Sequence, residues 1–163
     1  MDADHDRTEN DDRIALLVAF LRLSALISRP MRDGVADPAG ISPNELRLMM
    51  ALSGEGEAAG HELAELMGMH AMNVSRSLSS LHDLGLVEPA VDSANRRRRP
   101  FRLSDQGQAA FRAMESDIAR VADFLLGSLS VNERKTLKKL LLKVDDRIMA
   151  WQAPEHHPHV PRA

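Results

Sequence analysis

The sequence has no cysteine and few aromatic side chains. Its 163 residues include no Cys, only 3% Phe, Trp and Tyr together, and nine Met. The absence of cysteine excludes disulfides, cysteine-ligated metal sites and thiol-based redox sensing. With few rings available, leucine, isoleucine, valine and methionine must fill the core. A chain of this length is long enough to form one domain with a substantial core.

Long apolar runs are also scarce. The longest, Ile14 to Leu21, is far too short to cross a bilayer. The acidic N terminus lacks the basic flank of a signal peptide. We therefore expect a cytoplasmic protein with no membrane partner.

A net charge of −3 is unfavourable for binding nucleic acid, but the charges are unevenly distributed. Residues 1–12 hold six acids and one base, so the rest of the chain carries 20 basic and 18 acidic side chains, a net charge of +2. Screening over roughly 8 to 10 Å makes the local sign more important than the total. Residues 1–10 also lack any apolar period, and we expect them to be a disordered acidic tail.

A first helix is predicted within residues 11–29. Ile14, Leu17 and Leu21 mark one helical face, and further apolar side chains widen the apolar surface beyond a single stripe. A helix of this kind is suited to burial in a subunit interface. A loop over residues 30–41 is expected to follow it.

The next helix has a strong start signal. The run Ser42-Pro43-Asn44-Glu45 gives an N-cap serine, a proline at the first helical position and a glutamate at the third. This is a capping box with a favourable proline. The helix is expected to pack behind the segment that follows.

Two short helices meeting at a sharp corner are predicted over residues 62–84. Gly68 ends the first, because glycine readily adopts the left-handed conformation of a tight turn. In the second, Val74, Leu78 and Leu81 share one face. This pattern is typical of a helix-turn-helix.

The opposite face of the second helix is expected to be polar and to lack acidic side chains. Short or basic side chains of this kind can hydrogen-bond to base edges or phosphates, and the N-terminal end of such a helix enters a major groove first. The face consists of His70, Asn73, Arg76, Ser77 and Ser80.

A β-wing is predicted after the second helix. Residues 86–91 are expected to form one strand and residues 97–103 the returning strand, with a turn at residues 92–95. Five arginines fall within seven residues here, a run that a packed core would not tolerate. They are Arg96, Arg97, Arg98, Arg99 and Arg102. The same run would also suit a solvated edge strand, because charges protect sheet edges.

Two long helices are predicted over residues 104–151. Ser104 is the expected N-cap of the first, and Ser130-Val131-Asn132-Glu133 is a second capping box. With residues 11–29 they would form a helical dimerisation layer around a winged helix-turn-helix lobe at residues 42–103. Residues 11–151 would thus be a single domain, and residues 152–163 a flexible tail. The expected fold is mainly α with a small β-wing, in the α+β class.

The stretch from Glu62 to Gly107 resembles the MarR family of bacterial winged helix-turn-helix transcription regulators. The order of elements agrees over residues 11–151. Asn95 departs from the family pattern, in which aspartate usually precedes the wing arginine. The matching positions are Glu62-Leu63-Ala64, Val74-Ser75-Arg76, Leu81, Gly85-Leu86-Val87, Asn95-Arg96, Leu103-Ser104 and Gly107.

The resemblance implies a homodimeric regulator, typically a ligand-responsive repressor, on double-stranded DNA with a pseudo-palindromic operator. Arg96 aligns with the family's wing-tip arginine, which reaches into the minor groove, and its neighbours would contact phosphates. The residues expected to contact DNA are His70, Asn73, Ser75, Arg76, Ser77, Ser80, Arg96, Arg97 and Arg98.

The resemblance also implies a pocket for a small organic effector between the helical layer and the DNA-binding lobe. Its expected walls are the first helix, the helix after Ser42 and the start of the helix after Ser104. A repressor that works without an effector is equally compatible with the sequence.

Other function classes receive less support. No phosphate-binding glycine loop or catalytic motif is present, so neither an enzyme nor a cofactor is expected. His156, His157 and His159 lack a carboxylate or cysteine framework, and no metal site is expected there. The main alternative is a winged-helix module that binds another protein. Salt would weaken DNA binding steeply but would affect an apolar protein interface much less.

Overall fold

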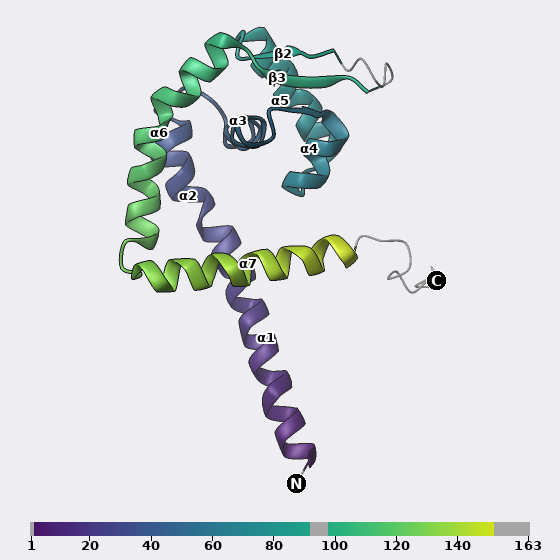
Figure 1. Ribbon diagram of the computed structural model, residues 1–163, viewed down its shortest axis with the longest axis vertical. Helices are drawn as coiled ribbons and strands as arrows, with labels where there is room; N and C mark the ends of the chain where they lie inside the picture. Colours follow the sequence, from purple (N-terminus) through teal and green to yellow (C-terminus); the bar gives the residue numbers. More distant parts are fainter. Residues whose placement is uncertain (1, 92–97, 152–163) are drawn as a thin grey trace. The chain divides into compact units, whose positions relative to one another are not determined.

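The computed structural model describes the backbone of residues 2–91 and 98–151, with side chains from residue 10 onward (Figure 1). The chain divides into two compact units, Met1–Val121 and Ala122–Ala163. The described residues are mainly helical with a small antiparallel sheet, which confirms the expected fold class. The elements in chain order are α1 (Asp2–Leu26), α2 (Ser28–Met31), the π-helix η1 (Arg32–Ala36), α3 (Pro43–Glu55), β1 (Glu57–Ala59), α4 (Gly60–Met67), α5 (Ala71–Asp83), β2 (Val87–Pro89), β3 (Pro100–Leu103), α6 (Asp105–Leu126) and α7 (Val131–Trp151).

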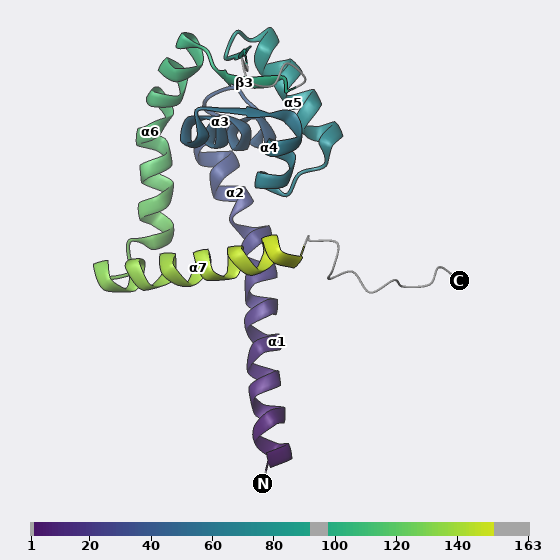
Figure 2. The same ribbon diagram turned by 45° about the vertical axis from the view of Figure 1, so that its right-hand side comes forward.

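Three helices and the sheet enclose the core of the first unit. Helices α3, α4 and α5 contact one another, and α3 also contacts β1 and β3 (Figure 2). The contacts are made by apolar side chains recurring at helical spacing. The largest fully buried side chains of this core, on helices and strands together, are Leu46, Leu48, Met49, Leu52, Leu63, Leu81, Val35, Val74, Val87 and Pro100.

The predicted capping box at the start of α3 is confirmed. The backbone N–H of Glu45 donates to the Ser42 hydroxyl at 3.3 Å, and the Ser42 N–H donates to the Glu45 carboxylate at 2.6 Å. Pro43 occupies the first turn, where its missing N–H has no helical acceptor to lose. The cap thus fixes where α3 begins.

The sheet has three antiparallel strands in the order β1-β3-β2. Strands β2 and β3 are the predicted wing, with Glu88 opposite Arg102 and Pro89 opposite Phe101. Strand β1 was not predicted from the sequence. Its three residues pair with the outer edge of β3, with Glu57 opposite Arg102, and so join the wing to the segment that leads into α4.

The start of α6 is fixed against the sheet by Ser104 and Gly107. The Ser104 hydroxyl accepts from the Gly107 N–H at 3.0 Å and donates to the Gly85 carbonyl at 2.6 Å, so the predicted N-cap is confirmed. A Cβ on Gly107 would lie 1.8 Å from the Leu86 carbonyl oxygen. Only glycine permits this close approach.

The prediction for residues 30–41 is wrong in its first half. The chain continues as α2 and the π-helix η1 before turns at residues 37–40. Pro30 lies in the first turn of α2, where proline is tolerated. The backbone of η1 lies close to α6 at Gly34, where an added Cβ would be 2.7 Å from Val121.

The acidic residues at the N terminus also differ from expectation. Composition predicts disorder over residues 1–10, but the structure begins α1 at Asp2. An acidic composition therefore does not prevent these residues from forming the first turns of α1.

The helical stretch Asn10–Ala36 is long and apolar enough to span a membrane by length and composition. This stretch is longer than the single apolar run Ile14–Leu21, because α1, α2 and η1 follow one another in the chain. A helix apolar on several sides is also what burial between subunits requires. Large apolar side chains of α1 are indeed uncovered in the chain, among them Ile14, Leu17, Val18, Leu21 and Leu23.

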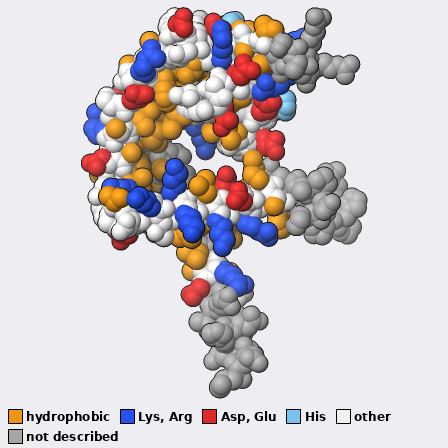
Figure 3. Space-filling view, viewed as in Figure 1, with side chains coloured by type: hydrophobic (Ala, Val, Ile, Leu, Met, Phe, Trp, Pro, Cys, Tyr) orange, Lys and Arg blue, Asp and Glu red, His pale blue; other side chains and the backbone are white. Residues whose placement is uncertain are grey.

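The second unit is dominated by α7. Its predicted capping box is confirmed, since the Ser130 N–H donates to Glu133 at 2.7 Å and the Glu133 N–H donates to Ser130 at 3.3 Å. None of its residues is buried. Lysine and arginine side chains alternate with hydrophobic ones along this helix (Figure 3).

Candidate nucleic-acid interface

The corner between α4 and α5 depends on one glycine. Gly68 ends α4 with φ 59° and ψ 36°, the left-handed conformation expected from the sequence. The Met69 N–H donates to the Ala64 carbonyl at 2.9 Å and the Gly68 N–H to the Glu65 carbonyl at 3.2 Å. A Cβ on Gly68 would meet nothing within 4 Å, so there is room for a side chain. Glycine is favoured here because of the left-handed backbone conformation.

Helix α5 separates its apolar face from an exposed one. Val74 and Leu81 are buried on the inner face, where α5 contacts α3 and α4. Asn73, Ser75 and Arg76 are exposed on the other side. These three side chains, with exposed His70 before the helix, are the predicted contacts that the structure leaves available to a groove.

Two of the predicted contacts face the interior instead. Ser77 is buried, with an exposed fraction of 6%, because it lies one turn from Val74 on the inner face. Ser80 is half-buried and hydrogen-bonds to the carboxylate of Glu45 on α3. The prediction that these serines face outward is therefore wrong.

Glu45 explains why Ser80 turns inward. Burial raises the pKa of Glu45, while hydrogen bonds from Ser80 and Ser42 lower it, and the net shift is downward. The carboxylate is only 8% exposed and needs such donors when it is ionised. Ser80 therefore helps to join α5 to α3.

The exposed face of α5 also contains residues outside the predicted set of DNA contacts. Met72 is 71% exposed, and Ser79 is exposed one turn after Arg76. Asp83 is exposed seven residues after Arg76, two turns along the same face. The face is thus free of acid only over its N-terminal part, and helical periodicity applied to residues 72–83 could have shown this.

Part of the wing lies within the described residues. The Arg102 guanidinium binds Glu88 across β2 and β3, with Nη2 at 2.6 Å from Oε1. Arg99 is exposed. Two of the predicted DNA contacts, Arg96 and Arg97, lie outside the described residues, as does Asn95.

Arg98 is held by carboxylates from two other elements. Its Nε and Nη2 donate to the two oxygens of Glu62 on α4, each at 2.8 Å, and its Nη1 lies 3.6 Å from Glu57 on β1. The Arg98 side chain is 25% exposed. Its guanidinium therefore faces the protein, and not outward as the prediction of a phosphate contact supposed.

Glu62 performs a second task in the same position. Its Oε2 accepts the Ala59 N–H at 2.7 Å and so satisfies one of the free donors at the start of α4. Ala59 has no side-chain acceptor, so only this half of a capping box is present. The Arg98 hydrogen bonds and then the Ala59 N–H lower the pKa of Glu62 to about 2.

The sequence contained one clue to this arrangement. Glu62 stands at the third position of a helix without a good N-cap residue, which marks it as a capping glutamate. Its pairing with a wing arginine 36 residues later depends on tertiary structure. Composition alone does not show which arginine of the run pairs with Glu62.

A cavity of about 290 Å³ lies between α3, α6 and the turn after η1. The predicted walls on α3 and the start of α6 are present. The first helix does not contribute, and residues 38–41 take its place. The lining residues are Pro38, Ala39, Ile41, Met49, Leu86, Ala110, Ala113, Met114 and Asp117.

No group of three or more metal-ligating side chains occurs among residues 10–91 and 98–151. The tail histidines His156, His157 and His159 lie outside the described residues.

A comparison with known protein families shows that residues 39–99 match the model of the MarR family. The matched segment runs from before α3 into the wing.

Solved structures of several regulators share the fold. The transcriptional regulator BldR of Sulfolobus solfataricus is 16% identical, with a TM-score of 0.75 over 84% of this chain and 96% of its own. A mutant MarR of Escherichia coli, complexed with operator DNA, is 19% identical, with a TM-score of 0.67 over 82% of this chain and 95% of its own. PcaV of Streptomyces coelicolor, in complex with its natural ligand, is 24% identical, with a TM-score of 0.62 over 78% of this chain and 89% of its own.

Proposed function

Residues 39–99 of this chain belong to the MarR family, and from that premise we propose that the protein is a sequence-specific DNA-binding transcription regulator. The observation that carries the proposal is the exposed face at the start of α5. There Asn73 and Arg76 stand uncovered on a helix whose opposite face is buried. A helix presented in this way can enter a major groove with its N-terminal residues against base edges.

Each exposed side chain has a chemical role in this proposal. Arg76 would read guanine or contact phosphate, Asn73 would pair with adenine, and Ser75 and His70 would hydrogen-bond to phosphates or bases. Met72, with its exposed apolar side chain, would contact a thymine methyl group. Arg96 and Arg97 would act from the wing in the minor groove and on the backbone.

We propose that the active form is a homodimer in the cytoplasm. Apolar side chains of α1 are uncovered in the first unit, and α7 has no buried residue in the second. A second copy would cover such surfaces, and twofold symmetry would place two α5 helices on the half-sites of a pseudo-palindrome. One subunit alone would make half of the contacts.

The cavity beside α6 is the proposed effector site of a ligand-responsive repressor. Its lining is mostly apolar and includes Asp117, but it includes no basic side chain. Asp117 also pairs with Arg120 at 2.9 Å. This lining favours a small neutral or cationic organic molecule over an anion, because an anion would find no cation among the lining residues.

The proposal is tested by selection of bound sequences from a random duplex pool. The parent should enrich a pseudo-palindromic site, and Arg76→Ala should bind about 10-fold or more weakly to it and lose preference at one base pair per half-site. Arg112→Ala, which removes an exposed arginine of α6, is the matched control and should behave as the parent.

Two outcomes would contradict the proposal. The first is that the parent enriches no sequence. The second is that its binding to a fixed duplex shows no loss of affinity between low and physiological salt, because neutralised phosphates release counterions. If binding did not depend on salt and the protein instead bound an apolar surface of another protein, the protein-interaction module would be favoured.

A further inference from the structure

We propose that Arg98 is a positioning residue for the wing: with Glu62 it ties the return strand to the start of α4, so that the wing and the reading helix keep one relative orientation. This inference rests on the proposed function, since it concerns how DNA is gripped. It gives Arg98 a different role from the arginines beside it. Arg98 would act through the protein and not on a phosphate.

The geometry of the pair supports a fixed arrangement. Two parallel hydrogen bonds of 2.8 Å join the planar guanidinium to the planar carboxylate of Glu62. A bidentate pair of this kind restricts orientation as well as distance. The third partner, Glu57, lies 3.6 Å away on β1.

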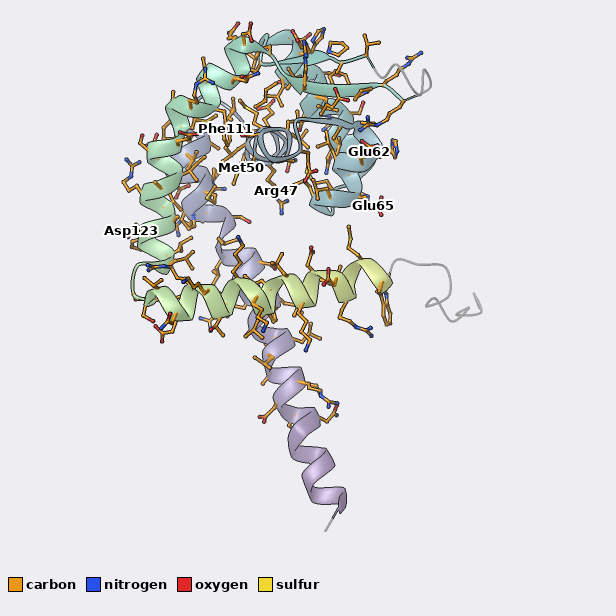
Figure 4. All side chains as sticks on the ribbon, viewed as in Figure 1. Arg47, Met50, Glu62, Glu65, Phe111 and Asp123 are labelled. Atoms are coloured by element: carbon orange, nitrogen blue, oxygen red, sulfur yellow. The ribbon has the colours of Figure 1, made fainter. Side chains whose placement is uncertain are left out.

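Three elements therefore meet at Arg98. Arg98 lies two residues before β3, Glu57 begins β1, and Glu62 lies in the first turn of α4. Because Glu62 also holds the Ala59 N–H at 2.7 Å, it cannot move away from Arg98 without uncapping α4. Figure 4 shows Glu62 on the side of α4 nearer the hairpin, while Glu65 lies farther along the helix.

One link between the wing and the reading helix runs through α4, beside the direct contact of α5 with β2. Helix α4 contacts α5, and the Gly68 corner joins the two with short hydrogen bonds. Strand β3 pairs with β1 on one side and with β2 on the other. A wing freed from Glu62 would keep its strand pairing and the contact of the His82 ring with the Val87 carbonyl at 3.2 Å, but it would lose the bidentate link to α4.

The two possible roles of Arg98 predict opposite results for Glu62→Gln. If Arg98 positions the wing, weakening its partner should weaken duplex binding about fivefold or more, as for other coupled pairs. If Arg98 instead binds phosphate, removing its competing carboxylate should strengthen binding. The control is Glu65→Gln, which makes the same chemical change at an exposed site on the same helix and should bind as the parent.

Arg98→Lys and Arg98→Ala separate the roles further. Lysine keeps the positive charge but cannot form the bidentate pair, so a positioning role predicts that both variants weaken binding similarly. The slope of log affinity against log salt should stay as in the parent, whereas loss of a phosphate contact lowers its magnitude by about 0.9. The double variant Arg98→Ala/Glu62→Gln should bind no more weakly than the weaker single variant.

A measurement without DNA distinguishes failure of this inference from failure of the proposed function. Amide hydrogen exchange in residues 98–103 of the full chain should speed up in Glu62→Gln and Arg98→Ala but not in Glu65→Gln. Unchanged exchange, a reduced salt slope for Arg98→Ala, or tighter binding by Glu62→Gln would each overturn the positioning role. Faster exchange in Glu62→Gln and Arg98→Ala, with a parent that binds no duplex, would uphold the link and overturn only the DNA-binding proposal.

Discussion

At the scale of single residues, charged side chains differ in role according to what lies opposite them. Arg76 is exposed with an open surface around it, whereas Arg98 is held by Glu62 and Glu57. Their chemistry is the same, and the neighbouring carboxylates distinguish an exposed guanidinium from one that is paired within the protein. Site residues on a basic wing therefore have to be assigned one by one.

The pairing of Glu62 predicts a specific dependence of stability on pH. Its pKa is about 2 in the folded chain and ordinarily 4.5. The pair therefore stabilises the fold at any pH above about 4.5, and this contribution disappears as the pH falls from about 4.5 toward 2. Solvent screening should keep it at no more than about 1 kcal/mol, because the pair is partly exposed.

Denaturant unfolding between pH 7 and about 2.5 measures this contribution. The difference in unfolding free energy between the parent and Glu62→Gln should be constant at neutral pH and should shrink toward zero in acid. Glu65→Gln should match the parent throughout. A difference between parent and Glu62→Gln that did not change with pH would contradict the assignment.

At the scale of elements, close backbone contacts decide where helices begin and how they meet the sheet. The start of α6 rests on the Leu86 carbonyl through Gly107, with the Ser104 hydroxyl bonded on both sides. The start of α3 is fixed by a capping box that needs no tertiary partner. Residues next to one another in the chain thus fix the start of α3, whereas the start of α6 also depends on the carbonyl groups of Gly85 and Leu86.

Gly107→Ala should therefore destabilise the protein. The new Cβ would lie 1.8 Å from a backbone oxygen, and the helix would have to shift, at a cost of about 1 to 3 kcal/mol. The matched control is Gly54→Ala in α3, where a Cβ meets nothing within 4 Å and should stabilise the helix by about 0.5 to 1 kcal/mol. Denaturant unfolding gives both values, and a Gly107→Ala protein as stable as the parent would refute the close contact.

At the scale of the whole molecule, the exposed apolar surface of α1 favours association with another subunit. Helix α1 is apolar on several sides and is exposed throughout its described side chains. Such a surface in one chain favours association with a second copy. The winged-helix lobe has its own buried core, so association would serve DNA binding more than folding of that lobe.

Leu17→Glu/Leu21→Glu should convert a dimer into a monomer, because two carboxylates would be buried in an apolar interface. Sedimentation equilibrium should give twice the chain mass of 18.0 kDa for the parent and the single mass for the variant. Binding to the selected duplex should fall about 100-fold or more with loss of the second half-site. The control is Arg22→Glu, which places the same side chain at a position that already carries a charge. A parent that sediments as a monomer would contradict the proposed dimer.

Local signals in the sequence were sufficient for much of the fold. The capping boxes at Ser42 and Ser130, the left-handed Gly68 and the apolar periods of α3 and α5 depend on residues close together in the chain. Such interactions need no knowledge of distant partners. They determined the helix-turn-helix, the wing and the mainly α fold class.

Tertiary structure decided what short-range signals could not. Strand β1 exists because β3 offers an edge, and Pro30 lies in the first turn of α2, where its missing N–H is tolerated. Ser80 faces Glu45, and Arg98 faces Glu62 from 36 residues away. The sequence by itself determined most of the helices and the β2–β3 hairpin, because hydrogen bonding within a helix, or between strands close in the chain, is local. Which polar side chains remain exposed was decided only by packing, because that depends on partners brought together by the fold.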